Sequence, residues 1–162
     1  MMKKTMMILL LVVMTACSGS FTRIPEADKT LRMSADIAGL TQAQIIQKTQ
    51  TWMEKEFTAY LNPILSDDRD EGKIIGRGQI AYPCSWVGCI SKENWKVAFD
   101  MYVKSADGSM ESLFRNIQLL SPPSGASSGM TSPVWSKRDM DAIRPELVKL
   151  NQSLIRFLSI QQ

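Results

Sequence analysis

The sequence predicts an α+β domain: one antiparallel sheet of about five strands with two helices packed on one of its faces. Two observations predict this class. Several stretches place apolar residues at every second position and are separated by short polar turns, which is typical of half-buried strands. Two other stretches, one after the first strand and one at the C-terminus, place apolar residues at helical spacing. The expected order is β-α-β-β-β-β-α, and the short connections between consecutive strands favour antiparallel pairing.

The first strand and the first helix are the clearest elements. In "LRMSADIAG", from Leu31 to Gly39, apolar and polar residues alternate as in a strand with one wet face. Thr41 then caps a helix, with Gln44 three residues later as in a capping box. The apolar stripe of this helix comprises Ile45, Thr49, Trp52, Met53, Phe57 and Tyr60. Such a stripe indicates packing of the helix on the sheet.

The stretch "NPILSDDRDEGKIIGRGQIAY" predicts two strands around an acidic turn. The turn holds the acidic residues Asp67, Asp68, Asp70 and Glu71. An EF-hand calcium loop is not favoured, because Gly72 stands where a third ligand is needed; a solvated hairpin turn is favoured. Gly76 and Gly78 lie two apart on one face of the second strand, which predicts a close backbone approach or a bulge.

The last two strands form a predicted hairpin, and a helix follows. "NWKVAFDMYVK" and "MESLFRNIQLL" flank a turn at Asp107-Gly108. Residues 121–133, "SPPSGASSGMTSP", form a polar loop that is either mobile or functional, with mobility favoured. Ser136 is expected to cap the final helix with Asp139, and Pro145 to kink or restart it.

The N-terminus, "MMKKTMMILLLVVMTACSGS", indicates the compartment. Its apolar core, Met6 to Met14, would span about 14 Å as a helix, less than half of the ~30 Å hydrocarbon layer, and therefore predicts a secretory signal. The ending "MTAC" resembles the lipobox of bacterial lipoproteins. That resemblance implies cleavage before Cys17, attachment of acyl chains such as palmitate to this residue, and, with Ser18 next, sorting to the outer membrane. The expected divisions are a signal peptide over 1–16, a polar tether over 17–29 and one domain over 30–162.

Two further cysteines, Cys84 and Cys89, have four residues between them in "YPCSWVGC". In an oxidising periplasm they are expected to form a disulfide with each other, since Pro83 and Gly88 suit a tight loop. Free or reactive thiols and a metal site remain as alternatives. A thioredoxin-like site has only two residues between its cysteines, and a zinc site needs more than two thiolates.

Composition excludes several classes of function. The chain has no histidine, which removes Ser-His-Asp and Cys-His catalysis and histidine-ligated zinc. Without Lys3 and Lys4 of the signal, 17 of the 19 basic residues remain against 16 acidic ones, so the mature chain is near neutral. Such a charge gives no electrostatic basis for binding nucleic acid.

The stretches "IIQKTQTWMEKEF", "DRDEGKIIGRGQI" and "WKVAFDMYVK" together resemble a family of secreted bacterial domains described as having a TATA-binding-protein-like fold. The resemblance covers roughly residues 30 to 120 and does not include "CSWVGC". It implies a fold and nothing about catalysis, because no activity is established for the family.

The expected function is that of a non-catalytic lipoprotein on the periplasmic face of the outer membrane, without a cofactor, which binds an envelope protein or ligand. The expected contact surface consists of Trp86 on the cysteine loop and of the open sheet face at Lys96, Asp100, Tyr102 and Lys104. Two alternatives are a hydrolase that uses the carboxylates of the acidic turn, and a purely structural or stress-related envelope lipoprotein.

Overall fold

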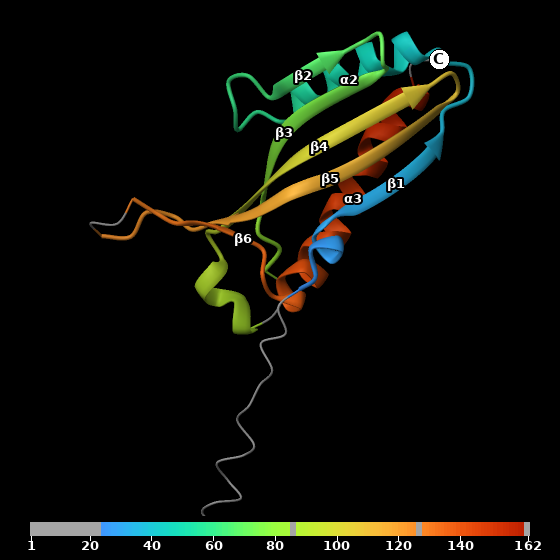
Figure 1. Ribbon diagram of the computed structural model, residues 1–162. Coiled ribbons are helices and arrows are strands. Elements are labelled where there is room, and N and C mark those ends of the chain that lie inside the picture. The colour runs from blue at the N-terminus through green and yellow to red at the C-terminus, as the bar shows by residue number, and fades with distance from the viewer. Residues whose placement is uncertain (1–23, 85–86, 126–127, 161–162) are drawn as a thin grey trace, which may run out of the picture.

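One antiparallel sheet with two long helices behind it forms the domain in the computed structural model (Figure 1). The structure describes residues 24–84, 87–125 and 128–160. The strands are β1 (Leu31–Asp36), β2 (Ile64–Asp68), β3 (Lys73–Ala81), β4 (Lys96–Ala106), β5 (Ser109–Leu120) and β6 (Thr131–Pro133). The helices are the 3-10 helices η2 (Glu26–Lys29) and η3 (Val87–Lys92) and the α-helices α2 (Gln42–Glu56) and α3 (Lys137–Ile160).

The strand order is β1-β5-β4-β3-β2, with β6 paired to the end of β5. The α+β class and the antiparallel sheet are therefore confirmed. The sixth strand, β6, lies within the predicted loop over 121–133, where Thr131, Ser132 and Pro133 pair with Leu120, Leu119 and Gln118. β5 and β6 thus extend the sheet as an antiparallel pair, and Figure 1 shows the described part of their connection projecting beyond the other strands.

The core lies between the helices and one face of the sheet. A row of edge-to-face aromatic contacts crosses it from α2 to β5, with ring centroids 5.4 Å apart for Trp52 and Phe57, 5.7 Å for Phe57 and Phe99, and 5.4 Å for Phe99 and Phe114. All four side chains are almost fully buried. Burial of each contributes roughly 1.5–3 kcal/mol to stability.

Gly76 and Gly78 allow α2 to approach β3 closely, as predicted. A β-carbon at Gly76 would lie 2.6 Å from Met53 Sδ, and one at Gly78 would lie 2.6 Å from the Phe99 ring and 2.9 Å from that of Phe57. Any larger residue at either position would displace the core side chains of α2 or β4.

Both predicted helix caps are confirmed. Thr41 and Gln44 form a capping box at the start of α2, and at α3 the Asp139 N–H donates to Ser136 Oγ over 3.0 Å. Helix α3 continues through Pro145, so the predicted restart is wrong. Its buried face, which includes Ile143 and Leu147 on either side of the proline, packs on the core, and this packing offsets the roughly 3 kcal/mol that a proline costs inside a helix.

The folded domain begins earlier than expected. Ile24 is buried in the core at 6% exposure, and η2 follows it. Arg144 on α3 donates from Nη2 to the Asp28 carbonyl over 3.3 Å. Residues 24–29 therefore belong to the domain and not to the predicted tether, whose composition gave no sign of these contacts.

Candidate functional site

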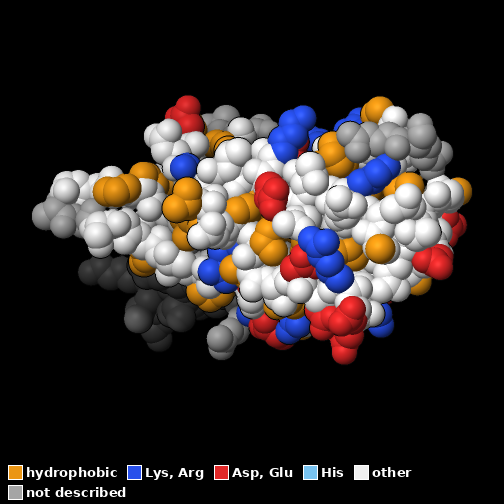
Figure 2. Space-filling view, turned by 90° about the horizontal axis from the view of Figure 1, so that it is seen from above, with side chains coloured by type: hydrophobic (Ala, Val, Ile, Leu, Met, Phe, Trp, Pro, Cys, Tyr) orange, Lys and Arg blue, Asp and Glu red, His pale blue; other side chains and the backbone are white. Residues whose placement is uncertain are grey.

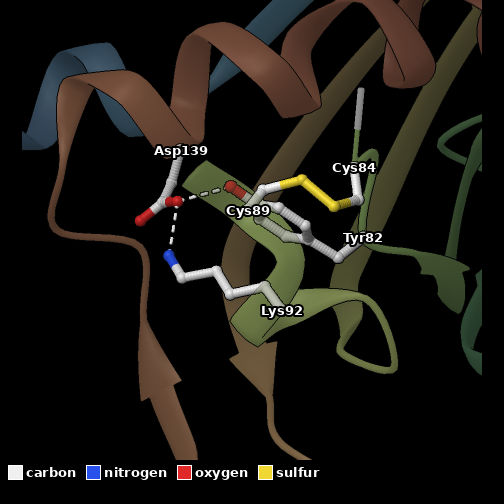
Figure 3. The surroundings of a disulfide bond; sticks show 5 residues. All are labelled: Tyr82, Cys84, Cys89, Lys92 and Asp139. Atoms are coloured by element: carbon white, nitrogen blue, oxygen red, sulfur yellow. Dashed lines mark hydrogen bonds and ion pairs between the residues drawn. A yellow bond between two sulfur atoms is a disulfide. The ribbon is translucent and has the colours of Figure 1, made fainter. Parts of the chain in front are cut away.

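Cys84 and Cys89 form a disulfide in the segment that joins β3 to β4 (Figure 3). Their Cα atoms are 5.6 Å apart, within the usual range for a disulfide. The pairing confirms the predicted disulfide over the alternatives of free thiols or a metal site. Cys89 is fully buried and Cys84 is exposed. Trp86, and the expected lipid-attachment residue Cys17, lie outside the described residues.

A buried carboxylate lies next to this disulfide. Asp139, in the first turn of α3, is 4% exposed and accepts hydrogen bonds from Tyr82 Oη at 2.5 Å, Lys92 Nζ at 2.6 Å and Ser136 Oγ at 2.8 Å. Figure 3 shows Tyr82 and Lys92 converging on it from the end of β3 and from η3. We call Tyr82, Lys92, Ser136 and Asp139 the Asp139 cluster; it joins α3 to both sides of the disulfide loop.

Folding shifts the pKa values of Asp139 and Tyr82 in opposite directions. Burial alone would raise the pKa of Asp139, but the hydrogen bonds from Lys92, Tyr82 and Ser136 and the charge of Lys92 lower it below its usual value. Burial and the hydrogen bond to Asp139 raise the pKa of Tyr82 well above 10. At neutral pH Asp139 is therefore ionised and Tyr82 keeps its proton. Lys92 Nζ also lies 5.2 Å and 5.4 Å from the ring centroids of Tyr82 and Trp95, where cation–π attraction adds to the ion pair.

A cavity of about 870 Å³ opens beside the disulfide, between α3 and the end of β3. It is larger than the cavities described on the open face of the sheet, of about 620, 340 and 140 Å³. Its apolar walls are Ile80, Ala81, Pro83, Ala142, Pro145 and Leu150, and Cys84 forms part of its rim. We call this cavity the disulfide groove.

The disulfide groove is rich in hydrogen-bond acceptors. Glu56, Asp141 and Glu146 line it together with one lysine, Lys149. Lys149 Nζ pairs with Glu146 and Lys137 Nζ pairs with Asp141, each over 2.7 Å. Pro145 has no N–H, so the carbonyl of Asp141 loses the intrahelical donor that any other residue at 145 would supply. The groove therefore suits a ligand that combines apolar surface with hydrogen-bond donors.

The sequence-predicted contact residues of β4 lie on the opposite, open face of the sheet. Lys96 and Lys104 are exposed, and Tyr102 is half-buried with the Arg115 guanidinium 5.4 Å from its ring centroid. Asp100 differs from the expectation: it is 3% exposed. The alternating pattern places Asp100 correctly on this face, but Arg77 on the neighbouring strand covers it.

Asp100 accepts from Arg77 through both carboxylate oxygens, at 2.8 Å from Nε and 3.4 Å from Nη2. Asn116 Nδ2 also donates to it, over 2.6 Å. Sequence reasoning missed the part played by Arg77 and Asn116. The register that places Arg77 opposite Asp100 follows from strand pairing, whereas Asn116 reaches Asp100 only because the register shifts between Ala98 and Asp100.

The carboxylates of the acidic turn are engaged locally. Asp67 pairs with Arg69 at 3.0 Å, Glu71 pairs with Lys73, and Asp68 accepts from the Glu71 N–H at 3.0 Å. All three acids are exposed. Within residues 24–84, 87–125 and 128–160, the structure brings no three acidic or cysteine side chains together as metal ligands. No helix in these ranges is long and apolar enough to span a bilayer.

Charges of both signs are interspersed over the side of the molecule that Figure 2 shows. Acidic and basic side chains alternate there with apolar and uncharged ones, and no extended area carries a single sign. That side therefore has no strong field to steer a highly charged partner.

Comparisons with known proteins agree with this architecture. A crystal structure of a DUF4468 family protein from Bacteroides ovatus matches 85% of this chain and 88% of its own, with a TM-score of 0.58 and 16% identity. A TBP-like protein from Parabacteroides distasonis matches 80% of this chain and 91% of its own, with a TM-score of 0.61 and 10% identity. At these identities the likeness shows the fold alone, and no curated protein matches the chain. Residues 33–119 match the model of a domain of unknown function with a TBP-like fold, and the chain belongs to this family, DUF4468.

Proposed function

We propose that this protein is a lipoprotein of the bacterial outer membrane whose periplasmic domain binds an envelope protein and catalyses no reaction. The order of a basic start, an apolar core and "TAC" at residues 15–17 supports lipid attachment at Cys17, and Ser18 supports sorting to the outer membrane. Two or more acyl chains hold a protein stably on a bilayer, whereas one does so only marginally. The disulfide is in keeping with an oxidising compartment.

The observation that carries the binding proposal is the position of the disulfide groove. The cavity of about 870 Å³ has Cys84 on its rim and α3 along its wall, and the disulfide and the Asp139 cluster together hold that rim against α3. A rigid concave surface loses little conformational entropy when it binds a partner. The carboxylates in the groove are placed for an apolar peptide segment that carries a lysine or arginine.

Lipid attachment is tested by intact-mass analysis of protein purified from membranes. The expected product begins at Cys17 and carries acyl chains. A Cys17→Ala variant controls for the thiol and is expected to leave the membrane fraction. An unmodified product that still begins at Met1 would contradict the anchoring.

Binding in the disulfide groove is tested by co-purification from outer-membrane extracts. Ala142 lines the groove, and Ala142→Trp would fill it. Gln152 is exposed on the same helix, so Gln152→Trp is a matched control. A partner that is retained by the wild type and by Gln152→Trp, and is lost with Ala142→Trp, is expected. Equal retention by all three proteins would place binding outside the groove.

A further inference from the structure

A second cavity, of about 340 Å³, lies on the open face of the sheet over the buried carboxylate Asp100. Its polar lining comes from Tyr60, Arg77, Asp100, Asn116, Gln118 and Thr131. These residues belong to the α2–β2 connection and to four strands, β3, β4, β5 and β6. We call this cavity the Asp100 pocket. It is separate from the disulfide groove, with which it shares no lining residue.

The Asp100 pocket is a preorganised site. Asp100, at 3% exposure, holds Arg77 by two hydrogen bonds and Asn116 by a third. Arg77 nevertheless keeps 45% of its side chain exposed, so its position is fixed while part of it still faces the pocket. Lost side-chain entropy on binding is small for groups already held in this way.

Backbone strain coincides with this pocket. Asn116 has a φ of 52°, the only non-glycine residue with positive φ in the described ranges, and it lies where the pairing of β4 and β5 shifts register. A non-glycine residue in this region costs about 1 kcal/mol. The strained conformation places the Asn116 amide on Asp100 and at the wall of the pocket. Bulges and strained residues of this kind are over-represented at functional sites.

The pocket is polar but carries no net charge. Arg77 and Asp100 neutralise each other, and among the described residues no other charged side chain lines it. An anion at Arg77 would have to compete with Asp100, and a cation would be repelled by Arg77. The remaining groups are amides and hydroxyls, which both donate and accept hydrogen bonds. Ala98 and Leu120 add apolar surface.

We propose that the Asp100 pocket binds a neutral saccharide ring. The hydroxyls of such a ring donate and accept as the amides and hydroxyls of the pocket do, and its C–H faces match the apolar surface of Ala98 and Leu120. A ligand with many hydroxyls and no charge also leaves the Arg77–Asp100 ion pair intact. This site goes beyond the proposed protein-binding groove and does not depend on it.

The test compares three matched sugars by NMR titration of the folded domain: N-acetylglucosamine, which is neutral, glucosamine, which is cationic, and glucuronate, which is anionic. N-acetylglucosamine is expected to bind most tightly and to shift backbone signals at residues 98–100 and 116–118. Gln118→Ala and Tyr60→Phe each remove one hydrogen-bonding group and are expected to weaken binding about fivefold. Gln152→Ala, the same change at an exposed site on α3, is the matched control.

Three outcomes would overturn the proposal. The first is the absence of shifts at residues 98–100 and 116–118 with N-acetylglucosamine at tens of millimolar. The second is tighter binding of glucosamine or glucuronate than of the neutral sugar. The third is unchanged affinity in both Gln118→Ala and Tyr60→Phe, which change an exposed and a half-buried side chain, while their melting temperatures show that both are folded.

Discussion

Two buried carboxylates, Asp139 at the disulfide end and Asp100 on the open sheet face, have nearly equal exposure, 4% and 3%. Their donors differ. Asp139 is bonded by the buried Tyr82 and by Lys92, whose side chain is 25% exposed, whereas Asp100 is bonded by Arg77, which is 45% exposed, and by the exposed Asn116. Burial of a carboxylate therefore does not by itself tell its role.

The position of the donors separates the two roles. The donors of Asp139 come from segments on both sides of the disulfide and from the start of α3, so this carboxylate holds the rim of the disulfide groove in place. Both donors of Asp100 line the Asp100 pocket, whereas Tyr82 alone of the donors of Asp139 lines the disulfide groove. Asp100 therefore holds polar groups where a ligand reaches them. The first role predicts a large effect on stability and the second a large effect on binding.

The largest expected difference is between Asp139→Ala and Asp100→Ala. Removing one partner of a buried ion pair costs about 3–5 kcal/mol; because Lys92 is partly exposed, we expect about 3 kcal/mol for Asp139→Ala. Arg77 regains water more readily, so Asp100→Ala is expected to cost about 1–2 kcal/mol. Urea unfolding monitored by circular dichroism measures both. Equal losses would show that the two carboxylates do not differ in their structural role.

Reduction of the disulfide has the next largest expected effect. The chain-entropy model gives about 2 kcal/mol for so short a loop. We expect Cys84→Ser/Cys89→Ser to lower the free energy of unfolding by this amount while leaving the Asp100 pocket unchanged. Saccharide binding that falls with the disulfide would mean that the two regions are coupled.

Alkaline pH affects the Asp139 cluster through Tyr82. Its pKa is raised in the folded state, so its contribution to stability is complete below the unfolded pKa of about 10 and is lost as the pH rises above that value. A loss of about 1 kcal/mol is expected within one pH unit above about pH 10. The free energy of unfolding of Tyr82→Phe is expected to fall less steeply above about pH 10 than that of the wild type. An identical fall would contradict the assignment of this loss to Tyr82.

Acid also destabilises the Asp139 cluster, but through a group whose pKa is lowered and not raised by folding. The pKa of Asp139 is lowered by folding, so its contribution is complete above the unfolded pKa of about 3.9 and is lost as the pH falls through the folded pKa. Asp139→Asn is expected to lose less stability than the wild type on acidification, measured by the urea midpoint at each pH. A steeper loss of stability with falling pH in this variant would refute the lowered pKa of Asp139.

The smallest expected effect belongs to Asn116→Gly. The variant loses the hydrogen bond to Asp100, but glycine adopts a φ of 52° without strain. These two terms are each about 1 kcal/mol and oppose each other, so the change in unfolding free energy is expected to stay below about 1 kcal/mol. Asn116→Val keeps the strain and is the contrasting variant, with a larger expected loss by thermal unfolding. Equal losses in the two variants would show that the φ of Asn116 carries no strain.

The sequence predicted the elements of the fold because each rests on local chemistry. The capping pairs Thr41–Gln44 and Ser136–Asp139 were identified from spacings of three residues, and both are present. The alternation in β4 assigned its two faces correctly. The glycine pair of β3 indicated a close approach or a bulge, and the structure shows the approach, since no larger residue fits beneath Met53 and Phe57.

The sites were predictable only in part, because their residues meet through tertiary pairing. The disulfide followed from its spacing and compartment. Tyr82 and Asp139 are 57 residues apart, and no local pattern links them. Arg77 and Asp100 follow from strand register, but the positive φ of Asn116 has no signature in "FRNIQ". The packing of Ile24 was likewise hidden in a polar segment.

Position-resolved photocrosslinking in intact cells tests the proposed function most directly. A photoreactive phenylalanine derivative would replace Leu150, which lines the disulfide groove, or Gln152, which is exposed on the same helix two residues later. We expect one discrete adduct from position 150, lost when Ala142→Trp is added, and none from position 152. Equal adducts from both positions, or no adduct from position 150 in lipidated protein, would contradict it.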